Sequence, residues 1–331
     1  MNHLLIPQIE LQLLERRDAL RSSLAAVPDS AGDLARLLRE VDRALERLPT
    51  SDYGHCVVCG GELDDAELQA NPLRRYCLCD LTEYGRAGLE RDLELAWEVQ
   101  ASLLPPQNLR HAGWLTHYRY RPAGAVSGDY CELIPCRDGD ETWLYFLLGD
   151  VSGKGVAAAY WMAHLSALVR RSLDSPLPVA ELLATVNRHL GERGAATHYV
   201  TLAAGRADRQ GQVELCNAGH CRPLVLGAAG PYEVDSTNLP LGLADDEAFA
   251  AQHFQVDSGD SLLLYSDGIT EAENSSAEPY GAARVAQSAQ TRAKLEPPQL
   301  ASECLADLQQ FVGETKPHDD VTLLILQFAG S

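Results

Sequence analysis

The sequence predicts an α+β fold for residues 107–331, with helical segments in front of it. Helical patterns lie near residues 156–173, 178–191 and 298–312. Short β-type runs separated by turn residues indicate strands near residues 115–120, 143–148, 199–205, 213–217, 223–226, 261–265 and 321–328. Because strands and helices form groups and do not alternate one by one, the pattern favours α+β over a parallel βαβ sheet.

The composition is that of an acidic globular protein. The chain has 331 residues, 46% of them hydrophobic, and a formal net charge of −20, which argues against direct nucleic-acid binding. We find no run of the ~20 apolar residues that a membrane helix needs, and no secretion signal at the start. Nine cysteines, four of them clustered, are typical of a reducing cytoplasm and a metal site.

Residues 1–50 are predicted to form a helical hairpin. Apolar residues recur at helical spacing on both sides of a break that contains Pro28 and Gly32. Each arm of about 20 residues would be about 30 Å long. Pro49 and Gly54 then mark the end of the second arm.

Residues 51–82 contain a cysteine pattern typical of a zinc finger. Cys56 and Cys59 form a Cys-x-x-Cys pair, and Cys77 and Cys79 follow after seventeen intervening residues. Four thiolates can close a tetrahedral structural zinc site. So small a segment has little core of its own, which favours a bound zinc over a finger that has lost its metal.

With the preceding helices, this segment resembles the DksA/TraR-type zinc finger over residues 36–85. That family has a second Cys-x-x-Cys pair, whose last cysteine would fall at position 80. This chain has Asp80 there and Cys79 beside it. Either of these two residues is therefore the fourth ligand.

Residues 83–106 are predicted to form a connector helix that Pro105 ends. One stripe of this helix repeats at steps of four and three residues: Leu89, Leu93, Ala96, Gln100 and Leu103. Such a stripe is typical of a short coiled-coil seam, which predicts a homodimer. The alternative is a helix that lies on its own domain.

Four aspartate motifs stand at the borders of the β-type runs. They are Ser127-Gly128-Asp129-Tyr130, Gly149-Asp150-Val151, Ser266-Asp267-Gly268 and His318-Asp319-Asp320. Hard divalent cations need several carboxylate oxygens that converge from different segments of a chain. The motifs therefore predict a site for Mg²⁺ or Mn²⁺.

In this order, the motifs resemble the metal-dependent protein phosphatase 2C superfamily, and within it the bacterial SpoIIE/RsbU-type serine phosphatases. The resemblance covers about residues 94–327 and includes Gln100–Pro105, Asn217–His220 and Leu239–Leu243. It implies two packed antiparallel β-sheets flanked by helices, with a metal centre at one edge between the sheets.

The resemblance also implies roles for single residues around two Mn²⁺ or Mg²⁺ ions. Asp150 matches a carboxylate that bridges the ions, and the Val151 carbonyl an adjacent ligand. Asp129 matches a carboxylate that orders metal-bound water. Asp267 and Asp319 match ligands of the second ion, and Asp320 a neighbour of that ligand.

Two further residues have both a catalytic and a structural interpretation. His220 has the side chain of a general acid, but a histidine between two strands is more often structural. Lys154 lies in the turn after Asp150, where it either contacts phosphate or is solvated.

The function implied by the resemblance is that of a cytoplasmic protein serine/threonine phosphatase. Its substrate would be a phosphorylated STAS-type anti-sigma-factor antagonist. The alternative is a catalytically silent scaffold that acts in transcription through the DksA-like part, which would contact RNA polymerase. Since a silent domain has no need of four aspartate motifs, the enzyme is favoured and the polymerase contact is not.

Overall fold

The computed structural model describes residues 6–26, 31–49, 53–56, 61–75, 83–191, 198–235, 238–244, 248–315 and 319–330. The chain divides into two compact units, Met1–Asp92 and Leu93–Ser331. Helix α4 (Glu83–Leu103) begins in the first unit and ends in the second. None of the helices in the described part of the chain combines the length and apolar character needed to cross a bilayer.

The first unit contains the predicted pair of helices and one short helix. Helices α1 (Ile6–Ala26) and α2 (Ala31–Arg47) pack together, and α3 (Asp65–Ala70) follows. Their small core includes Ile9 and Val41. A core of this size stabilises a segment only weakly, which is why such units often depend on a metal or a partner.

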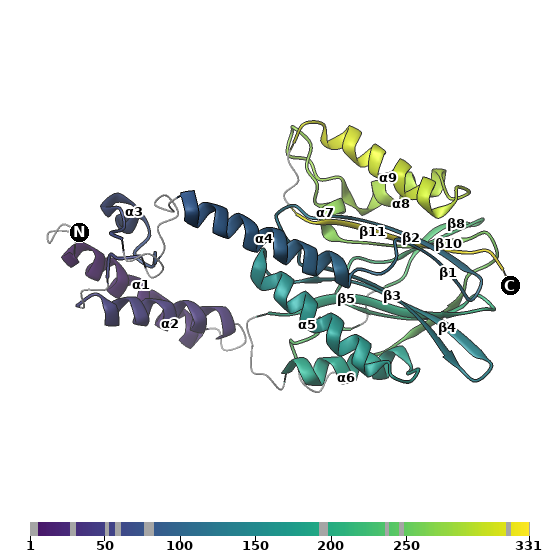
Figure 1. Ribbon diagram of the computed structural model, residues 1–331, viewed down its shortest axis with the longest axis horizontal. Coiled ribbons are helices and arrows are strands. Elements are labelled where there is room, and N and C mark those ends of the chain that lie inside the picture. The colour runs from purple at the N-terminus through teal and green to yellow at the C-terminus, as the bar shows by residue number, and fades with distance from the viewer. Residues whose placement is uncertain are drawn as a thin grey trace. The chain divides into compact units, whose positions relative to one another are not determined.

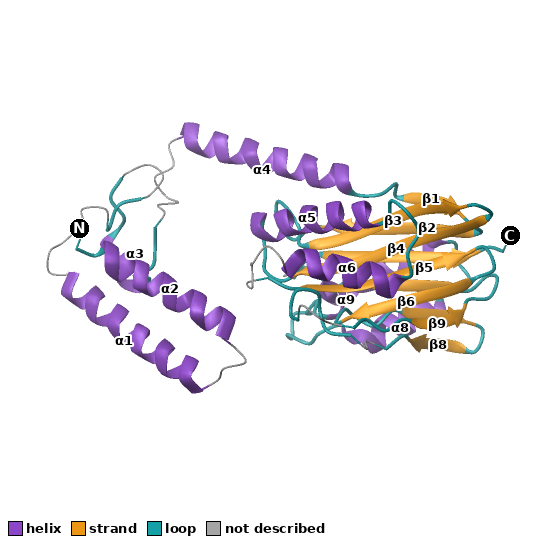
Figure 2. Cartoon of the chain, turned by 90° about the horizontal axis from the view of Figure 1, so that it is seen from below, coloured by secondary structure: helices purple, strands orange, loops and turns teal. Residues whose placement is uncertain are grey.

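The second unit is built on two antiparallel sheets (Figures 1 and 2). The order in the first sheet is β1 (Asn108–His111), β2 (Trp114–Arg121), β11 (Val321–Phe328), β10 (Ser261–Tyr265), β7 (Leu224–Gly227) and β8 (Gly230–Glu233). The order in the second is β3 (Asp129–Asp138), β4 (Glu141–Val151), β5 (Val200–Asp208), β6 (Gln212–Ala218) and β9 (Gln252–Gln255).

Helices cover the outer face of each sheet, so the unit has four layers. Helices α5 (Val156–Ser172) and α6 (Val179–Gly191) pack on the five-stranded sheet. Helices α8 (Gly281–Thr291) and α9 (Pro297–Val312) pack on the six-stranded sheet. The predicted architecture of two antiparallel sheets flanked by helices is therefore confirmed.

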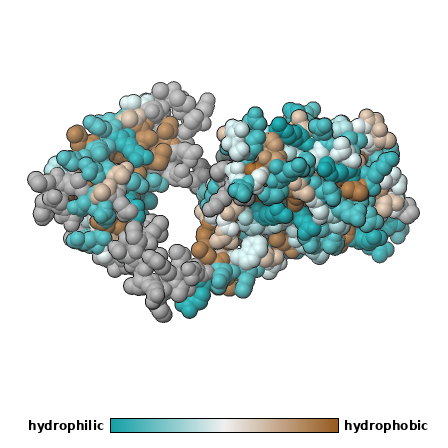
Figure 3. Space-filling model, turned by 90° about the horizontal axis from the view of Figure 1, so that it is seen from above, coloured by the Kyte–Doolittle hydropathy of each residue, from teal (hydrophilic) through white to brown (hydrophobic). Residues whose placement is uncertain are grey.

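Alternation along the strands explains this layering. In β4, Leu144 and Phe146 point into the layer between the sheets, whereas Tyr145 and Leu147 point toward α5 and α6. All four side chains are fully buried. A strand buried on both faces reads as a continuous apolar run, which is how the sequence showed β4. On the face of the protein in Figure 3, hydrophilic residues predominate and hydrophobic ones are scattered.

Four strands were not predicted: β1, β3, β8 and β9. Three of them have only four residues. Strand β3 is longer, but its sequence mixes charged residues and Pro135 among the apolar ones. Its ten residues pair with the apolar strand β4 along their whole length, so pairing rather than local composition makes this segment a strand.

The predicted coiled-coil seam of α4 needs a correction at its end. Gln100 is buried and bonds to Ser127, and Leu103 packs against the core beneath α5. These two positions therefore face their own domain, as the alternative interpretation proposed. Among the side chains of this helix that the structure describes, the exposed large apolar ones are Leu95, Trp97 and Val99.

Candidate active site

The pairing of β3 with β4 brings two of the predicted aspartates face to face. Asp129, the first residue of β3, is the direct partner of Asp150, near the end of β4. Along their strands, Asp129 and Asp150 point to the same side of the sheet as Cys131 and Leu148, which fill the layer between the sheets. Their carboxylates therefore lie at the end of the inter-sheet layer.

The six-stranded sheet supplies polar groups to the same end. The hydroxyl of Thr322, in β11, donates a hydrogen bond to Asp129 Oδ2. Ser266, directly after β10, donates its hydroxyl to the Asp320 carbonyl and accepts the Thr322 N–H at 2.9 Å. Hydroxyl groups thus occupy inter-sheet positions that apolar residues fill elsewhere in these strands.

Asp267 and Asp319 come from two adjacent segments of the six-stranded sheet. Asp267 begins the short helix α7 (Asp267–Thr270) after β10, and Asp319 precedes β11. Gly268, the residue after Asp267, packs against the backbone of Asp319 and Asp320. A Cβ atom at position 268 would be 2.0 Å from the Asp320 carbonyl oxygen. Glycine is therefore required here for Asp267 and Asp319 to lie side by side.

The carboxylates of this cluster raise one another's pKa. Burial, followed by the charges of Asp267, Asp319 and Asp320, raises the pKa of Asp150 to about 7, while Lys154 acts in the opposite direction. Burial also raises the pKa of Asp129 well above its usual range, and the Thr322 hydrogen bond offsets this only in part. Burial and mutual repulsion thus disfavour the charged form of these carboxylates, and a bound cation would favour it.

Two oxygen atoms converge beside Gly128. A Cβ atom built on this glycine would be 3.0 Å from Asp150 Oδ1 and 3.2 Å from the Val151 carbonyl oxygen. A side chain at position 128 would therefore press on both oxygen atoms. The resemblance implies that these two groups are the bridging carboxylate and the ligand adjacent to it.

The donor set of this edge fits Mg²⁺ or Mn²⁺. Carboxylate and carbonyl oxygens are the ligands that these hard cations prefer. The described residues contain no group of three or more histidine, cysteine, aspartate or glutamate side chains arranged as a complete metal site. A site of the predicted kind also uses the Val151 carbonyl and water, so the oxygens that are present fit it.

Asp320 holds the loop between β2 and β3. Its Oδ1 accepts the N–H of Ala123 at 2.7 Å, and its Oδ2 accepts the N–H of Gly128 at 2.9 Å. Both carboxylate oxygens thus bind the loop between β2 and β3. Of the two adjacent aspartates, Asp319 is the one whose carboxylate is left to face the cluster.

Gln100 holds the same loop from the other side, a role that the sequence analysis missed. Its amide nitrogen donates to the Ser127 carbonyl at 2.7 Å, and its amide oxygen accepts the Ser127 N–H at 3.0 Å. The Ser127 hydroxyl in turn accepts the Asp129 N–H at 3.0 Å. A lone polar residue within an apolar helical stripe was the one signal of this contact.

His220 is enclosed rather than directed at the cluster. Its Nδ1 lies 3.0 Å from the Thr201 hydroxyl, and its backbone N–H donates to Asn217 Oδ1 at 2.9 Å. Burial lowers its pKa to about 4, with a smaller opposing effect of the Tyr265 backbone. These contacts favour the structural interpretation of this histidine.

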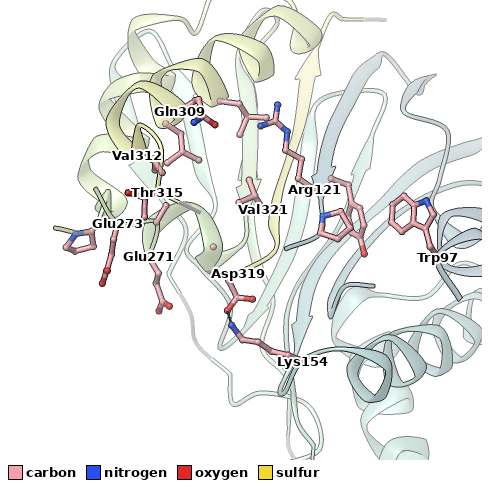
Figure 4. A pocket seen from close by; sticks show the side chains of 17 residues that line it. Trp97, Arg121, Lys154, Glu271, Glu273, Gln309, Val312, Thr315, Asp319 and Val321 are labelled. Carbon is pink, nitrogen blue, oxygen red and sulfur yellow. Dashed lines mark hydrogen bonds and ion pairs between the residues drawn. The ribbon is translucent and has the colours of Figure 1, made fainter. Parts of the chain in front are cut away.

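Lys154 forms an ion pair with the cluster. Its Nζ lies 2.7 Å from Asp319 Oδ2, and its side chain is 68% exposed (Figure 4). The lysine is therefore not a plain solvated turn residue.

The zinc-finger prediction falls mostly outside the described residues. Cys59, Cys77, Cys79 and Asp80 lie there. Cys56 is described and buried in the core of the first unit, and its N–H donates to the Gly61 carbonyl at 2.8 Å.

A sequence profile of the family described as Stage II sporulation protein E (SpoIIE) matches residues 140–329. Protein IcfG of Synechocystis is 25% identical over 59% of this chain and 35% of its own length. Phosphoserine phosphatase RsbU of Bacillus subtilis is 24% identical over 72% of this chain and 70% of its own length. The chain thus spans about a third of one curated relative and more than two thirds of the other.

The fold is also similar to that of a solved structure, the SiaA-PP2C domain of Pseudomonas aeruginosa. The TM-score is 0.64 at 19% sequence identity, and the match covers 75% of this chain and all of that domain. At this level of identity, the likeness concerns the fold alone.

Proposed function

The chain belongs to the SpoIIE family, and from that membership we propose that it is a metal-dependent protein phosphatase that hydrolyses phosphoserine or phosphothreonine. The relative RsbU, whose name is that of a phosphoserine phosphatase, supports this proposal over most of the chain. The proposed setting is the cytoplasm.

The observation that carries the proposal is the register of β3 on β4. It places Asp129 directly opposite Asp150 at the end of the inter-sheet layer. The charges of Asp267 and Asp319 act on Asp150 from the other sheet. Such a cluster of like charges destabilises the fold. A ligand that needs the charges is therefore the physical reason for the cluster to be present.

In this proposal the aspartates hold two Mn²⁺ or Mg²⁺ ions. Asp150 and the Val151 carbonyl would contact one ion, and Asp150, Asp267 and Asp319 the other. When bound, such a pair supplies charge neutralisation at the phosphate and a water activated for attack. Asp129 would order the metal-bound water, and Asp320 and Gln100 keep the loop of Asp129 in position.

The proposed substrate is a phosphorylated STAS-type protein in a partner-switching pathway, as the resemblance to SpoIIE/RsbU-type phosphatases implies. Homodimerisation through α4 remains part of the proposal. It would have to use residues before Gln100, because Gln100 and Leu103 face the domain of their own chain.

The test is hydrolysis by protein that has been stripped of metal with a chelator. We expect little turnover of p-nitrophenyl phosphate until Mn²⁺ or Mg²⁺ is restored, because the cluster alone repels phosphate. A serine-phosphorylated STAS protein should lose its phosphate under the same conditions, and a tyrosine-phosphorylated protein serves as the control. Absence of metal-dependent turnover on every substrate would contradict the proposal.

For the first unit we propose one structural zinc, bound by Cys56, Cys59 and Cys77 with Cys79 or Asp80 as the fourth ligand. The DksA/TraR-like spacing and the small core of this unit support it. Elemental analysis of protein purified without chelator should find about one zinc per chain. Cys56→Ser should lose the zinc and unfold this unit locally, whereas metal-free wild type would refute the site.

A further inference from the structure

A groove leads away from the aspartate cluster. Its volume is about 940 Å³, and Lys154, Gly268 and Asp319 line the end nearest the cluster. Figure 4 shows the opposite walls: Arg121 extends from the end of β2, and Gln309 and Val312 lie on the side of α9. When a residue of another polypeptide is bound at the cluster, the neighbouring residues of that polypeptide can therefore lie along the groove.

The groove continues past Arg121. A second hollow of about 360 Å³ shares Arg121, Leu305 and Gln309 with the first and adds Arg119. The two together follow the face between β2 and α9. A compact small molecule needs a single cavity of at most about 1,000 Å³, whereas an elongated groove of this kind suits a segment of polypeptide.

The lining combines an apolar floor with charges that differ between the two ends. Leu308 and Val321 form part of the floor, and Trp97 adds an indole that is 38% exposed. Large aromatic side chains of this kind often anchor protein partners. Carboxylates such as Glu271 lie at the end near the cluster, and the arginines lie at the far end.

The two arginines differ in how they are engaged. The guanidinium of Arg119 donates to the Ser302 hydroxyl at 3.2 Å, a neutral partner. Arg121 is exposed at the mouth of both hollows. In a chain of net charge −20, a basic patch beside an acidic site selects for negative charge at one end of its ligand.

We propose that this groove binds the segment of the substrate protein next to the phosphorylated residue, and that Arg119 and Arg121 select an acidic side chain on that segment. The proposal rests on the proposed phosphatase function and adds its substrate preference. An extended chain spans at most about 3.6 Å per residue, so the selected position lies a few residues from the phosphate.

The test compares three phosphoserine peptides that differ at one position. The position carries glutamate, glutamine or lysine and is scanned about two to six residues from the phosphoserine, on both sides. We expect wild type to prefer glutamate over lysine by about five-fold in kcat/KM, the effect of an exposed charge pair. Arg121→Glu should reverse this order, measured as the ratio of kcat/KM between the glutamate and lysine peptides within the same variant.

Arg137→Glu is the matched control, since it makes the same charge change at an exposed position near the end of β3 and does not line the groove. It should keep the wild-type preference. Equal kcat/KM for the three peptides in wild type, at all scanned positions, would overturn the groove proposal. So would peptides that are hydrolysed no better than p-nitrophenyl phosphate.

Two other outcomes are distinguishable. If Arg121→Glu changes the sedimentation of the protein but not its peptide preference, the groove binds a second copy of the chain and the proposal is overturned. If wild type does not hydrolyse p-nitrophenyl phosphate with any metal, the phosphatase function itself fails. Metal-dependent turnover without peptide discrimination rejects only the groove.

Discussion

Strand β3 carries two buried carboxylates that face opposite sides of one sheet and differ in the charge of the side chains around them. Glu132 faces α5, where it accepts hydrogen bonds from Arg170 Nε at 2.9 Å and Nη2 at 3.0 Å. Asp129 faces the inter-sheet layer and accepts the Thr322 hydroxyl. Burial raises the pKa of both carboxyls. Arg170 lowers that of Glu132, whereas Asp150 and Asp320 raise that of Asp129 further.

The difference separates a structural charge from a functional one. A buried carboxylate that serves the fold has a cation from its own chain, because an unpaired buried charge costs several kcal/mol. Asp129 and Asp150 instead lie beside further carboxylates, and Asp129 also accepts the Thr322 hydroxyl. A cation from outside the chain would relieve the repulsion in such an arrangement.

The largest effect that tests this comparison is on activity. Asp150→Asn keeps the volume of the side chain but removes a charge that both proposed ions need, so turnover should fall by about a thousand-fold or more. The fold should survive, because the change relieves repulsion between carboxylates. Asp267→Asn should lose less turnover and recover part of it at high Mn²⁺ concentration, since it weakens the binding of only one of the two proposed ions.

Turnover of p-nitrophenyl phosphate against Mn²⁺ concentration, with circular dichroism for folding, measures both variants. Asp174→Asn, in an exposed pair with Arg171, is the control and should match wild type. A folded Asp150→Asn variant with near wild-type turnover would show that the cluster is structural.

His220 differs from Glu132 and Asp129 in that it is a buried titratable group kept neutral. Its pKa of about 4 lies below the ordinary value of 6.5, so the unfolded chain binds a proton first as the pH falls. Stability from this group is present above pH 6.5 and is lost as the pH falls toward 4, by about 3 kcal/mol at most.

Urea unfolding at a series of pH values should therefore show a difference between wild type and His220→Gln that shrinks or reverses on acidification. The variant His189→Gln, at an exposed position in α6, should follow wild type at every pH. Parallel curves for wild type and His220→Gln would mean that the histidine is not held neutral by burial.

The opposite partners of Glu132 and Asp129 predict opposite changes in stability. Glu132→Gln leaves Arg170 without its carboxylate and should destabilise the metal-free protein by about 1–2 kcal/mol, a modest cost because that arginine is half exposed. Asp129→Asn removes a repelled charge and should stabilise it by about 1 kcal/mol. Thermal unfolding in chelator measures both, and changes of the same sign would remove the distinction between the two sites.

The aspartates at the strand ends were predicted from the sequence, whereas the hydroxyl groups between the sheets were not. Asp150 and Asp267 follow apolar runs that end in a glycine turn or begin a helix, so their positions at strand ends were readable from local pattern. Thr322 and Ser266 were not found, because a hydroxyl beside a strand has no pattern of its own. Their role appears only when alternation and the pairing of distant strands are known.

The contact of Gln100 shows the same limit. The helix period correctly put it on the buried side of α4, but the period does not say which surface covers that side. A coiled-coil partner and the loop at Ser127 are equally compatible with one helical stripe. Only the structure, in which both backbone groups of Ser127 bond to this amide, decides between them.

Gln100→Leu tests whether this contact serves the site or only the fold. It removes both hydrogen bonds to Ser127 and should weaken Mn²⁺ binding by about ten- to a hundred-fold, the usual cost of losing a group that orients metal ligands. Isothermal titration with Mn²⁺ measures the affinity without relying on activity. Ser102→Ala, an exposed change on the same helix, is the control. A lower melting temperature with unchanged affinity would indicate a role in stability alone.

The smallest effect concerns Lys154, the one cation of the chain seen bound to a carboxylate of the cluster among the described residues. If it acts as a substitute for metal, it competes with the ion for Asp319. Lys154→Gln should then strengthen Mn²⁺ binding by about two- to five-fold, since the pair is exposed and such pairs contribute at most about 1 kcal/mol. The gain should shrink at high salt, because screening already weakens the pair in wild type.

Titration with Mn²⁺ at low and high ionic strength measures this effect directly. Arg171→Gln, which removes the cation of the exposed pair with Asp174, leaves the cluster intact and should not change the affinity. A lysine that instead binds the phosphate of the substrate predicts a different pattern: unchanged Mn²⁺ affinity with a higher KM for p-nitrophenyl phosphate. Because one readout changes in each case, the two roles of Lys154 are separable in a single variant.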